Sequence, residues 1–436
     1  MRAPKITTVS WSPTSQSGIV TKFLKRPAAP LAAEETARKV LVDIKKRGDA
    51  AVLEYAAKFD GTKLKVADLR IREEEIVAAG NVIDSAFKKA AKETLKRVVA
   101  FSKKGLSKNW EMPTGHGGTI GEKFTPLQRV GAYIPGGTAP LVSTALMTVP
   151  IAKTAGVPEI VACTPADADG RVNPYILYAL KISGVTEIYR IGGIQAIGAM
   201  AYGTRAIRKV QKIVGPGGPY VTAAKRQVYG DVGLDMVAGP SEIAILADTS
   251  ANPAHVAADL LSQAEHGSAH EKTLLVSTSV KLAENVKAEL IKQTKSLSRQ
   301  ETILKVLNSG TLLVVVKNID NGIKLCNLFA PEHMELIVRN PQKLIAKIKT
   351  AGALFIGPWT PESAGDFVAG PSHVLPTGGT AAIFSGLTVN DFQRRTSIIE
   401  FTRKDLEQTR ETIEVFGRVE TLDAHAHSAS IRFKKD

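Results

Sequence analysis

The stretch that decides the fold is Val130-Gly131-Ala132-Tyr133-Ile134-Pro135-Gly136-Gly137, an apolar run that ends in a glycine-rich turn. The residues that follow predict a helix over 141–155 and then a second apolar strand over 159–163. Strands that alternate with helices indicate a parallel sheet, because parallel neighbours must be joined by a crossover. Such sheets bind ligands at the carboxyl ends of their strands, which makes the turn a candidate binding position.

The same alternation continues along most of the chain. Strands are expected at 187–191 and 209–214, with helices between them, and a second series of strands follows Pro240, at 242–247, 273–277, 311–316, 334–338 and 353–356. We therefore predict an α/β protein with two parallel-sheet domains of incomplete Rossmann type. The expected division is an N-terminal arm (1–25), a first α/β domain (26–134 and 241–387), an inserted second α/β domain (135–240) and a C-terminal helical tail (388–436).

Composition narrows the functional class. The chain has 436 residues with 57 Lys+Arg against 42 Asp+Glu, a formal charge of +15 that is spread along the sequence. Because no aromatic-rich basic motif accompanies the charge, a basic surface is favoured over nucleic-acid binding. No signal peptide or membrane-spanning run is recognised, and two cysteines without a CxxC pattern favour a reducing compartment, so a cytoplasmic location is expected.

Glycine-rich turns follow three of the predicted strands, at Pro135-Gly136-Gly137, Gly192-Gly193 and Gly215-Pro216-Gly217-Gly218. Backbone amides in such turns can hold a pyrophosphate. None matches G-x-G-x-x-G, so the usual dinucleotide fingerprint is absent. Two interpretations stay open at this point, nucleotide binding and tight turns of an ordinary α/β fold.

Several polar residues stand in similar settings. Gln263 and His266 close a predicted amphipathic helix before Gly267, and on a helix they would share one face. Glu332-His333 precedes the apolar strand at 334–338, where an acid and an imidazole could transfer protons or simply form a polar strand entry. Asp366 follows a strand and could bind a ligand or cap a helix. His266, Asp366 and a tail histidine could form a metal site, whereas an amide such as Gln263 is an uncommon zinc ligand.

The motifs quoted next carry a resemblance to a known family. They are Tyr133–Pro140, Lys225-Arg226-Gln227, Ala238–Glu242, Leu260–Gly267, Ala330–His333, Pro361–Asp366, His373–Thr377 and Asp391-Phe392-Gln393. Together they resemble histidinol dehydrogenase, collinearly from about residue 30 to the end of the chain. The resemblance implies a zinc- and NAD-dependent homodimer that oxidises L-histidinol to L-histidine, in histidine biosynthesis, through a bound histidinaldehyde.

The resemblance also implies roles for particular residues. One Zn²⁺ per subunit would be held by Gln263, His266, Asp366 and His425, with the tail histidine supplied across the dimer interface. Glu332 and His333 would be the proton-transfer pair, and Tyr133, Gln195 and Gly218 would contact NAD. The substrate would meet a wider set, namely Ser241, Gln263, His266, His333, Asp366, Glu420 and His425.

This sequence departs from the family pattern at several positions, which leaves open a substrate other than L-histidinol. Gly218 stands where the family often has Asn, Ser372 replaces an Asn before His373, and His427 lies two residues beyond His425 as a competing tail ligand. The alternative is a paralogous zinc and NAD alcohol dehydrogenase for another small alcohol, such as sulfopropanediol. A non-catalytic nucleotide- or metal-binding protein is disfavoured, because it would not need both Glu332 and His333.

Overall fold

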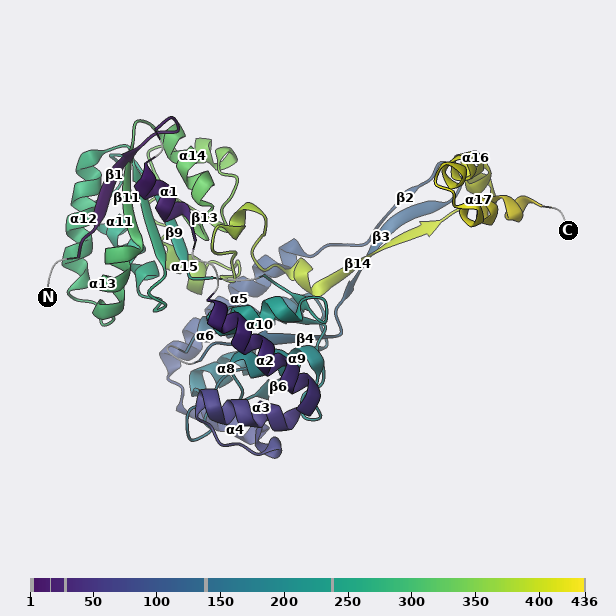
Figure 1. Cartoon of the computed structure of the whole chain (residues 1–436), viewed down its shortest axis with the longest axis horizontal. Coiled ribbons are helices and arrows are strands. Elements are labelled where there is room, and N and C mark those ends of the chain that lie inside the picture. Colours follow the sequence, from purple (N-terminus) through teal and green to yellow (C-terminus); the bar gives the residue numbers. More distant parts are fainter. Residues whose placement is uncertain (1–3, 16, 27–29, 137–139, 237–238, 435–436) are drawn as a thin grey trace. The chain divides into compact units, whose positions relative to one another are not determined.

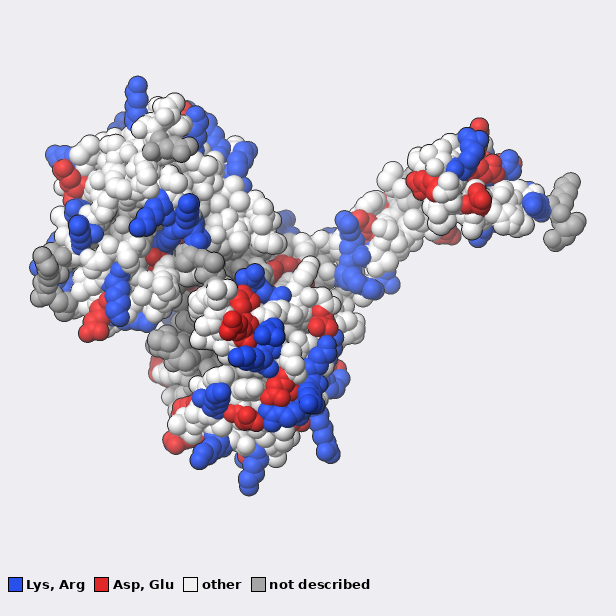
Figure 2. Space-filling view, viewed as in Figure 1, with Lys and Arg blue, Asp and Glu red and all other residues white. Residues whose placement is uncertain are grey.

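The computed structural model describes residues 4–15, 17–26, 30–136, 140–236 and 239–434. These residues form two compact units, the first from 1–105 and 127–392 and the second from 106–126 and 393–436. Within the described residues, no helix combines the length and apolar character that a bilayer crossing requires. On the face shown in Figure 2, Lys and Arg side chains are interspersed with Asp and Glu, so the positive excess is not gathered there in one patch.

The first unit contains a six-stranded parallel sheet (Figure 1). Its strand order is β1-β11-β10-β9-β12-β13, and every pairing is parallel. The central strands are apolar on both faces, as expected for a parallel sheet covered by helices on each side. Their bounds are β1 (Thr7–Trp11), β9 (Glu242–Ala247), β10 (Lys272–Ser277), β11 (Thr311–Val316), β12 (His333–Ile337) and β13 (Ala353–Ile356).

The strand β9 shows how the two faces are filled. Ile243 and Ile245 point to one core cluster and Ala244 and Leu246 to another, because successive side chains of a strand alternate. The first cluster is closed by α11 (Pro253–Ala264), α12 (Val280–Thr294) and α13 (Gln300–Ser309). The second is closed by α1 (Gly18–Leu24) and α14 (Ile319–Phe329). Smaller helices of this part are η3 (Pro341–Lys347), α15 (Glu362–Phe367), η4 (Thr380–Ala382) and η5 (Val389–Phe392).

A five-stranded parallel sheet of order β6-β5-β4-β7-β8 also belongs to the first unit. Its strands are β4 (Arg129–Tyr133), β5 (Glu159–Cys163), β6 (Glu187–Tyr189), β7 (Lys212–Val214) and β8 (Gly233–Leu234). One core cluster joins it to α2 (Leu31–Arg47), α3 (Asp49–Tyr55), α9 (Gly193–Tyr202) and α10 (Pro219–Val228). The other helical segments are η1 (Ala56–Asp60), η2 (Val66–Asp68), α4 (Glu73–Val82), α5 (Ser85–Gly105), α6 (Val142–Leu146), α7 (Val149–Thr154) and α8 (Pro174–Ser183).

The second unit is an antiparallel three-stranded sheet followed by helices. Its strand order is β14-β3-β2, from β14 (Gln393–Glu400), β3 (Thr119–Pro126) and β2 (Trp110–Pro113). α16 (Arg403–Val419) packs on α17 (Asp423–Ser430), and η6 (Ile431–Phe433) follows. Thr402 caps α16, since its hydroxyl accepts from the Asp405 backbone while the Asp405 carboxylate accepts from the Thr402 backbone N–H.

The α/β class with two parallel sheets is confirmed, and the domain boundaries need three corrections. Residues 7–11 are not an arm, because β1 pairs with β11 and extends the six-stranded sheet. Much of 26–134 belongs with the five-stranded sheet, since the apolar side of α2 and the strand β4 are part of that sheet and its core. The tail (388–436) is not helical throughout, because residues 393–400 form a strand that pairs with β3 from another part of the chain.

Candidate active site

The predicted proton-transfer pair and Ser241 lie at the amino edge of the six-stranded sheet. His333 opens β12, Ser241 directly precedes β9, and the two strands are neighbours with His333 paired to Ile243. From the sequence, ligands were expected at the carboxyl edges of the parallel sheets. In this sheet the helices α11 and α15 run back from their strands, so their side chains reach the amino edge instead.

The backbone of Glu242 fixes both members of the pair. Its N–H donates to Glu332 Oε2 at 3.0 Å, and its carbonyl lies 3.2 Å from His333 Nδ1. A carbonyl can only accept, so Nδ1 carries the proton in this contact and the second ring nitrogen is left for chemistry. Glu332 and His333 are both buried, so the backbone of a single residue orients an acid and an imidazole in a desolvated site.

Two carboxyl groups from α15 face the free side of His333. Its Nε2 lies 3.6 Å from Asp366 Oδ1 and 3.7 Å from Glu362 Oε1. The two acids are four residues apart and therefore share one face of α15. Ser262 Oγ donates to Glu362 at 2.8 Å, and His373 Nδ1 lies 3.9 Å from Asp366. Asp366 thus belongs to a helix that approaches His333, rather than to the end of a strand.

Gln263 and His266 come from the end of α11. Gln263 is fully buried, and neither its Oε1 nor its Nε2 has a hydrogen-bond partner among the residues that the structure describes. The helix ends at Ala264, so His266 lies just beyond it in a turn and does not share a helix face with Gln263 as the sequence suggested. The exposed ring of His266 places Nδ1 2.8 Å from Ser241 Oγ.

These residues could hold a divalent metal, because several of their buried donor atoms have no hydrogen-bond partner among the described residues. Across the described ranges, the buried polar atoms without a partner include both side-chain atoms of Gln263, His333 Nε2 and Glu362 Oε1. Each such atom costs about 1–3 kcal/mol unless something binds it. His333, Glu362 and Asp366 also form a group close enough to share one ion. Nitrogen and oxygen donors of this kind suit zinc; Glu362 was not among the predicted ligands.

Burial and charge set the protonation of the site. Burial raises the pKa of Glu332 to about 8, although His333 opposes the shift. Burial alone would lower the pKa of His333, but Glu332, Asp366 and Glu362 outweigh it and raise this pKa to about 10. Burial also disfavours ionisation of Asp366, yet His333 and His373 hold its pKa below the usual value. A cation held by Asp366 would compete with the proton on His333 and leave the ring able to accept one.

The residues predicted to contact NAD gather at the carboxyl edge of the five-stranded sheet. Tyr133 ends β4, and its buried hydroxyl oxygen accepts from the Gly193 N–H at 3.1 Å. Gln195 is fully buried in the first turn of α9. Gly218 precedes α10, and a Cβ added there would meet nothing within 4 Å. Gly137, in the first glycine-rich turn, lies outside the described residues.

Comparison with known proteins shows the family to which this chain belongs. The histidinol dehydrogenase family model matches residues 25–433. Histidinol dehydrogenase of Heliobacterium mobile is 44% identical over 397 residues, which cover 91% of this chain and 93% of that protein. The Lactococcus lactis enzyme of the same name is 42% identical over 399 residues, covering 92% of each. The chain belongs to the histidinol dehydrogenase family. It is therefore an enzyme of the oxidoreductase class.

The crystal structure of histidinol dehydrogenase from Elizabethkingia anophelis has the same fold. It matches with a TM-score of 0.93 at 36% identity and covers 99% of both chains. Within the histidinol dehydrogenase family, the departure at Ser372 has a local explanation. The Ser372 hydroxyl donates to the Met147 carbonyl at 2.8 Å and accepts from the Val374 N–H at 3.2 Å, so it holds the loop that carries His373.

Two predicted residues lie in the second unit. Glu420 directly follows α16 and His425 lies in α17, and both side chains are exposed, as is His427. The structure brings together Ser241, His266, Glu332, His333 and Asp366, and Gln263 is the penultimate residue of α11, the helix that precedes His266. Glu420 and His425 are described only within their own unit.

Two residues of the site were not predicted from the sequence. They are Glu362, and Glu242, whose backbone contacts Glu332 and His333. A signal for Glu362 existed, because Glu362 and Asp366 are spaced four apart after Pro361, as two acids on one helix face would be. Glu242 had no such signal, since it acts through its backbone and its side chain is paired with a distant residue. That residue is Arg26, whose Nε lies 2.6 Å from Glu242 Oε1, with both side chains nearly buried.

Replacing Arg26 should destabilise the protein. Arg26→Met leaves the Glu242 carboxylate buried and unpaired, which costs about 3–5 kcal/mol in typical proteins. We expect a loss of about 3 kcal/mol in the free energy of unfolding, measured by urea denaturation. Arg97→Met is the matched control, because Arg97 and Glu93 pair on the surface and such pairs contribute at most about 1 kcal/mol. Equal losses in the two variants would contradict a structural role for the buried pair.

Proposed function

We propose that the protein oxidises L-histidinol to L-histidine with two NAD⁺ and one zinc ion per subunit, through a histidinaldehyde that stays bound. The observation that carries the proposal is the buried Glu332–His333 pair, held by the backbone of Glu242 and facing unsatisfied nitrogen and oxygen ligands. An adjacent acid and base are what two successive dehydrogenations require. Membership of the histidinol dehydrogenase family supplies the substrate.

The metal would be held by Gln263, His266, Asp366 and His425 of the neighbouring subunit. Bound zinc would anchor the imidazole and amine of the substrate, and bound NAD⁺ would accept the hydride. Ser241 lies beside His266 and would contact the substrate, as would Glu420 from the tail. Because the carbinol carbon is held in one place, both oxidations can take place on the same bound molecule.

His333 would serve the first oxidation. In neutral form its Nε2 accepts the hydroxyl proton of histidinol as the hydride leaves, while Nδ1 stays bonded to the Glu242 carbonyl. Glu332 would serve the second oxidation. Its carboxylate accepts a proton from water as the water oxygen bonds to the aldehyde carbon, which gives the anion of the hydrate. That anion loses the second hydride and becomes the carboxylic acid. Burial of both groups keeps bulk water away from the aldehyde.

The dinucleotide would lie at the carboxyl edge of the five-stranded sheet, in contact with Tyr133, Gln195 and Gly218. That edge is where open parallel sheets bind nucleotides. Gly218 offers only its backbone, since the Asn side chain often found there is missing. The buried Tyr133 hydroxyl has its oxygen engaged by Gly193, which leaves its proton for a ligand.

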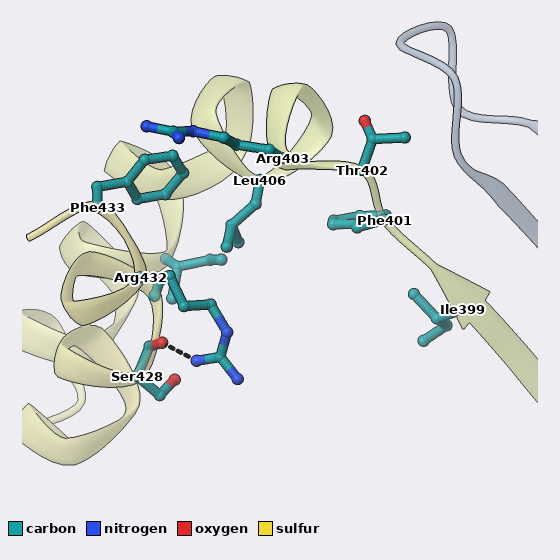
Figure 3. A pocket seen from close by; sticks show the side chains of 10 residues that line it. Ile399, Phe401, Thr402, Arg403, Leu406, Ser428, Arg432 and Phe433 are labelled. Carbon is teal, nitrogen blue, oxygen red and sulfur yellow. Dashed lines mark hydrogen bonds between the residues drawn. The ribbon is translucent and has the colours of Figure 1, made fainter.

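We also propose a homodimer in which the tails are exchanged, because apolar residues are exposed on the second unit. Ile399, Phe416 and Val419 are 71%, 61% and 72% exposed, respectively. Figure 3 shows a pocket of the same unit, between the end of β14 and the helices α16 and α17. Its walls combine apolar and arginine side chains, from Ile399, Phe401, Thr402, Arg403, Leu406, Ile413, Ser428, Ala429, Arg432 and Phe433. A second copy would cover such a surface.

Steady-state assays test the proposed substrate. The purified protein with NAD⁺ should turn over L-histidinol, lose activity with a chelator and regain it with zinc. Turnover of sulfopropanediol but not of L-histidinol would replace the proposal by the paralogous alcohol dehydrogenase, to which the missing Asn at Gly218 points. No turnover of either alcohol after zinc addition would contradict both.

A further inference from the structure

One carboxyl group at the cofactor edge has no part in the steps above. Asp60 ends η1, and its Oδ2 accepts from Gln195 Nε2 at 2.8 Å and from the Gly192 backbone N–H at 3.4 Å. Gln195 is fully buried. Asp60 therefore contacts the side chain of Gln195, which is predicted to bind NAD, and the backbone at the amino end of α9.

This contact decides which end of the Gln195 amide faces away. A carboxylate only accepts hydrogen bonds, so it holds the amide nitrogen and directs Oε1 away from itself. Gln195 Oε1 is buried and has no partner among the residues that the structure describes. An unsatisfied buried acceptor costs about 1–3 kcal/mol, so a ligand that donates to it is favoured. Turning the amide over would set two acceptors against each other.

A glycine lies beside that oxygen. A Cβ added to Gly193 would lie 2.9 Å from Gln195 Oε1, and Gly193 has a φ of +59° that also disfavours a side chain. A side chain at position 193 would therefore crowd this oxygen, and glycine avoids that contact.

Asp60 also changes what the start of α9 can bind. Helix amino ends attract phosphates through their free N–H groups. Here the Gly192 N–H is directed at a carboxylate, whose charge disfavours a second anion at the same place. A neutral donor, such as a hydroxyl or an amine, is therefore preferred there over the pyrophosphate.

We propose that Asp60 is a positioning residue for the dinucleotide, which fixes Gln195 so that Oε1 accepts a hydrogen bond from a ribose hydroxyl or a base amine of NAD. The inference rests on the proposed function, in which Gln195 contacts the cofactor. Asp60 acts through Gln195 and touches no reacting atom.

Equilibrium binding of NADH to the full-length protein, followed by fluorescence, tests this role without turnover. Asp60→Ala frees the amide, and one net hydrogen bond of about 1 kcal/mol corresponds to roughly fivefold weaker binding. Asp60→Asn keeps an acceptor for Gln195 Nε2 and should bind NADH within about twofold of the wild type. In a Gln195→Ala background, Asp60→Ala should cause no further loss, because residues that act as a unit are not additive.

The controls separate positioning from stability. L-Histidinol affinity, measured by calorimetry on the same samples, should not change, and thermal unfolding checks that each variant is folded. Asp60→Ser, whose hydroxyl is too short to reach the amide, replaces the alanine variant if that one does not fold. An unchanged NADH affinity in Asp60→Ala or its replacement Asp60→Ser, or an equal loss in the Gln195→Ala background, would overturn this inference alone. Failure of the wild type to bind NADH would overturn the proposed function and this inference with it.

Discussion

His333→Asn should lower turnover of L-histidinol by about 10²- to 10⁴-fold, the usual contribution of a positioned general base. Asparagine can still donate from its amide to the Glu242 carbonyl, which His333 Nδ1 contacts at 3.2 Å, so the local fold should be kept. It offers no nitrogen that can accept a proton. The loss should therefore fall on kcat, measured under saturating L-histidinol and NAD⁺.

Metal content decides what such a loss means. His333 lies in a group with Glu362 and Asp366 that could itself hold an ion. If His333 is the base, the variant should retain about one zinc per subunit by elemental analysis. Loss of zinc together with activity would show that His333 is a ligand, and the proton-transfer role would then need another residue.

Glu332→Gln should separate the two oxidations. The Gln oxygen can still accept from the Glu242 N–H, which donates to Glu332 at 3.0 Å. The amide cannot take a proton from water, so the aldehyde should be oxidised about 10²-fold or more slowly. Supplied with histidinaldehyde, the variant should be nearly inactive, whereas the first NADH from L-histidinol should form at a rate close to that of the wild type in a single-turnover experiment.

The pH dependence of the second oxidation gives a further readout. Burial raises the pKa of Glu332 to about 8, and only the ionised carboxylate acts as a base. The wild-type rate from histidinaldehyde should therefore rise with pH up to about 8 and level off above it, and this rise should be missing in Glu332→Gln. Equal slowing of both half-reactions in the variant would contradict a role confined to the second step.

The parallel sheets were predictable because most of their strands are short apolar runs and the central ones are buried on both faces. The strands 159–163, 242–247, 311–316 and 353–356 were expected with the bounds that the structure has. Short apolar runs between helices carry a strong signal, since the whole run is excluded from water.

The second unit was not predictable for the opposite reason. β2 is exposed along its whole length and β14 along nearly all of it, so neither shows the alternation of a half-buried strand. The tail at 388–436 was predicted to be helical, whereas residues 393–400 form β14 and α16 begins only at Arg403. The edge strand β1 was also missed, although its burial does alternate, because only Trp11 of its five residues is buried.

Within the site, the residue types could be predicted from the sequence, but the position in the fold where their side chains come together could not. Glu332 and His333 are adjacent in the sequence, so their chemistry was visible. Glu242 and Asp60 act through contacts that span 90 or more residues, to Glu332 and Gln195, and no local pattern marks such pairs. The amino-edge position of the site likewise follows from the return of α11 and α15, which only the fold supplies.

The amount of NADH formed per L-histidinol, with limiting substrate taken to completion by the wild-type protein, tests the central claim most directly. Two successive oxidations at one site, by His333 and then Glu332, predict about two NADH per molecule, with L-histidine as the product. One NADH per molecule, with the aldehyde released, would contradict the account.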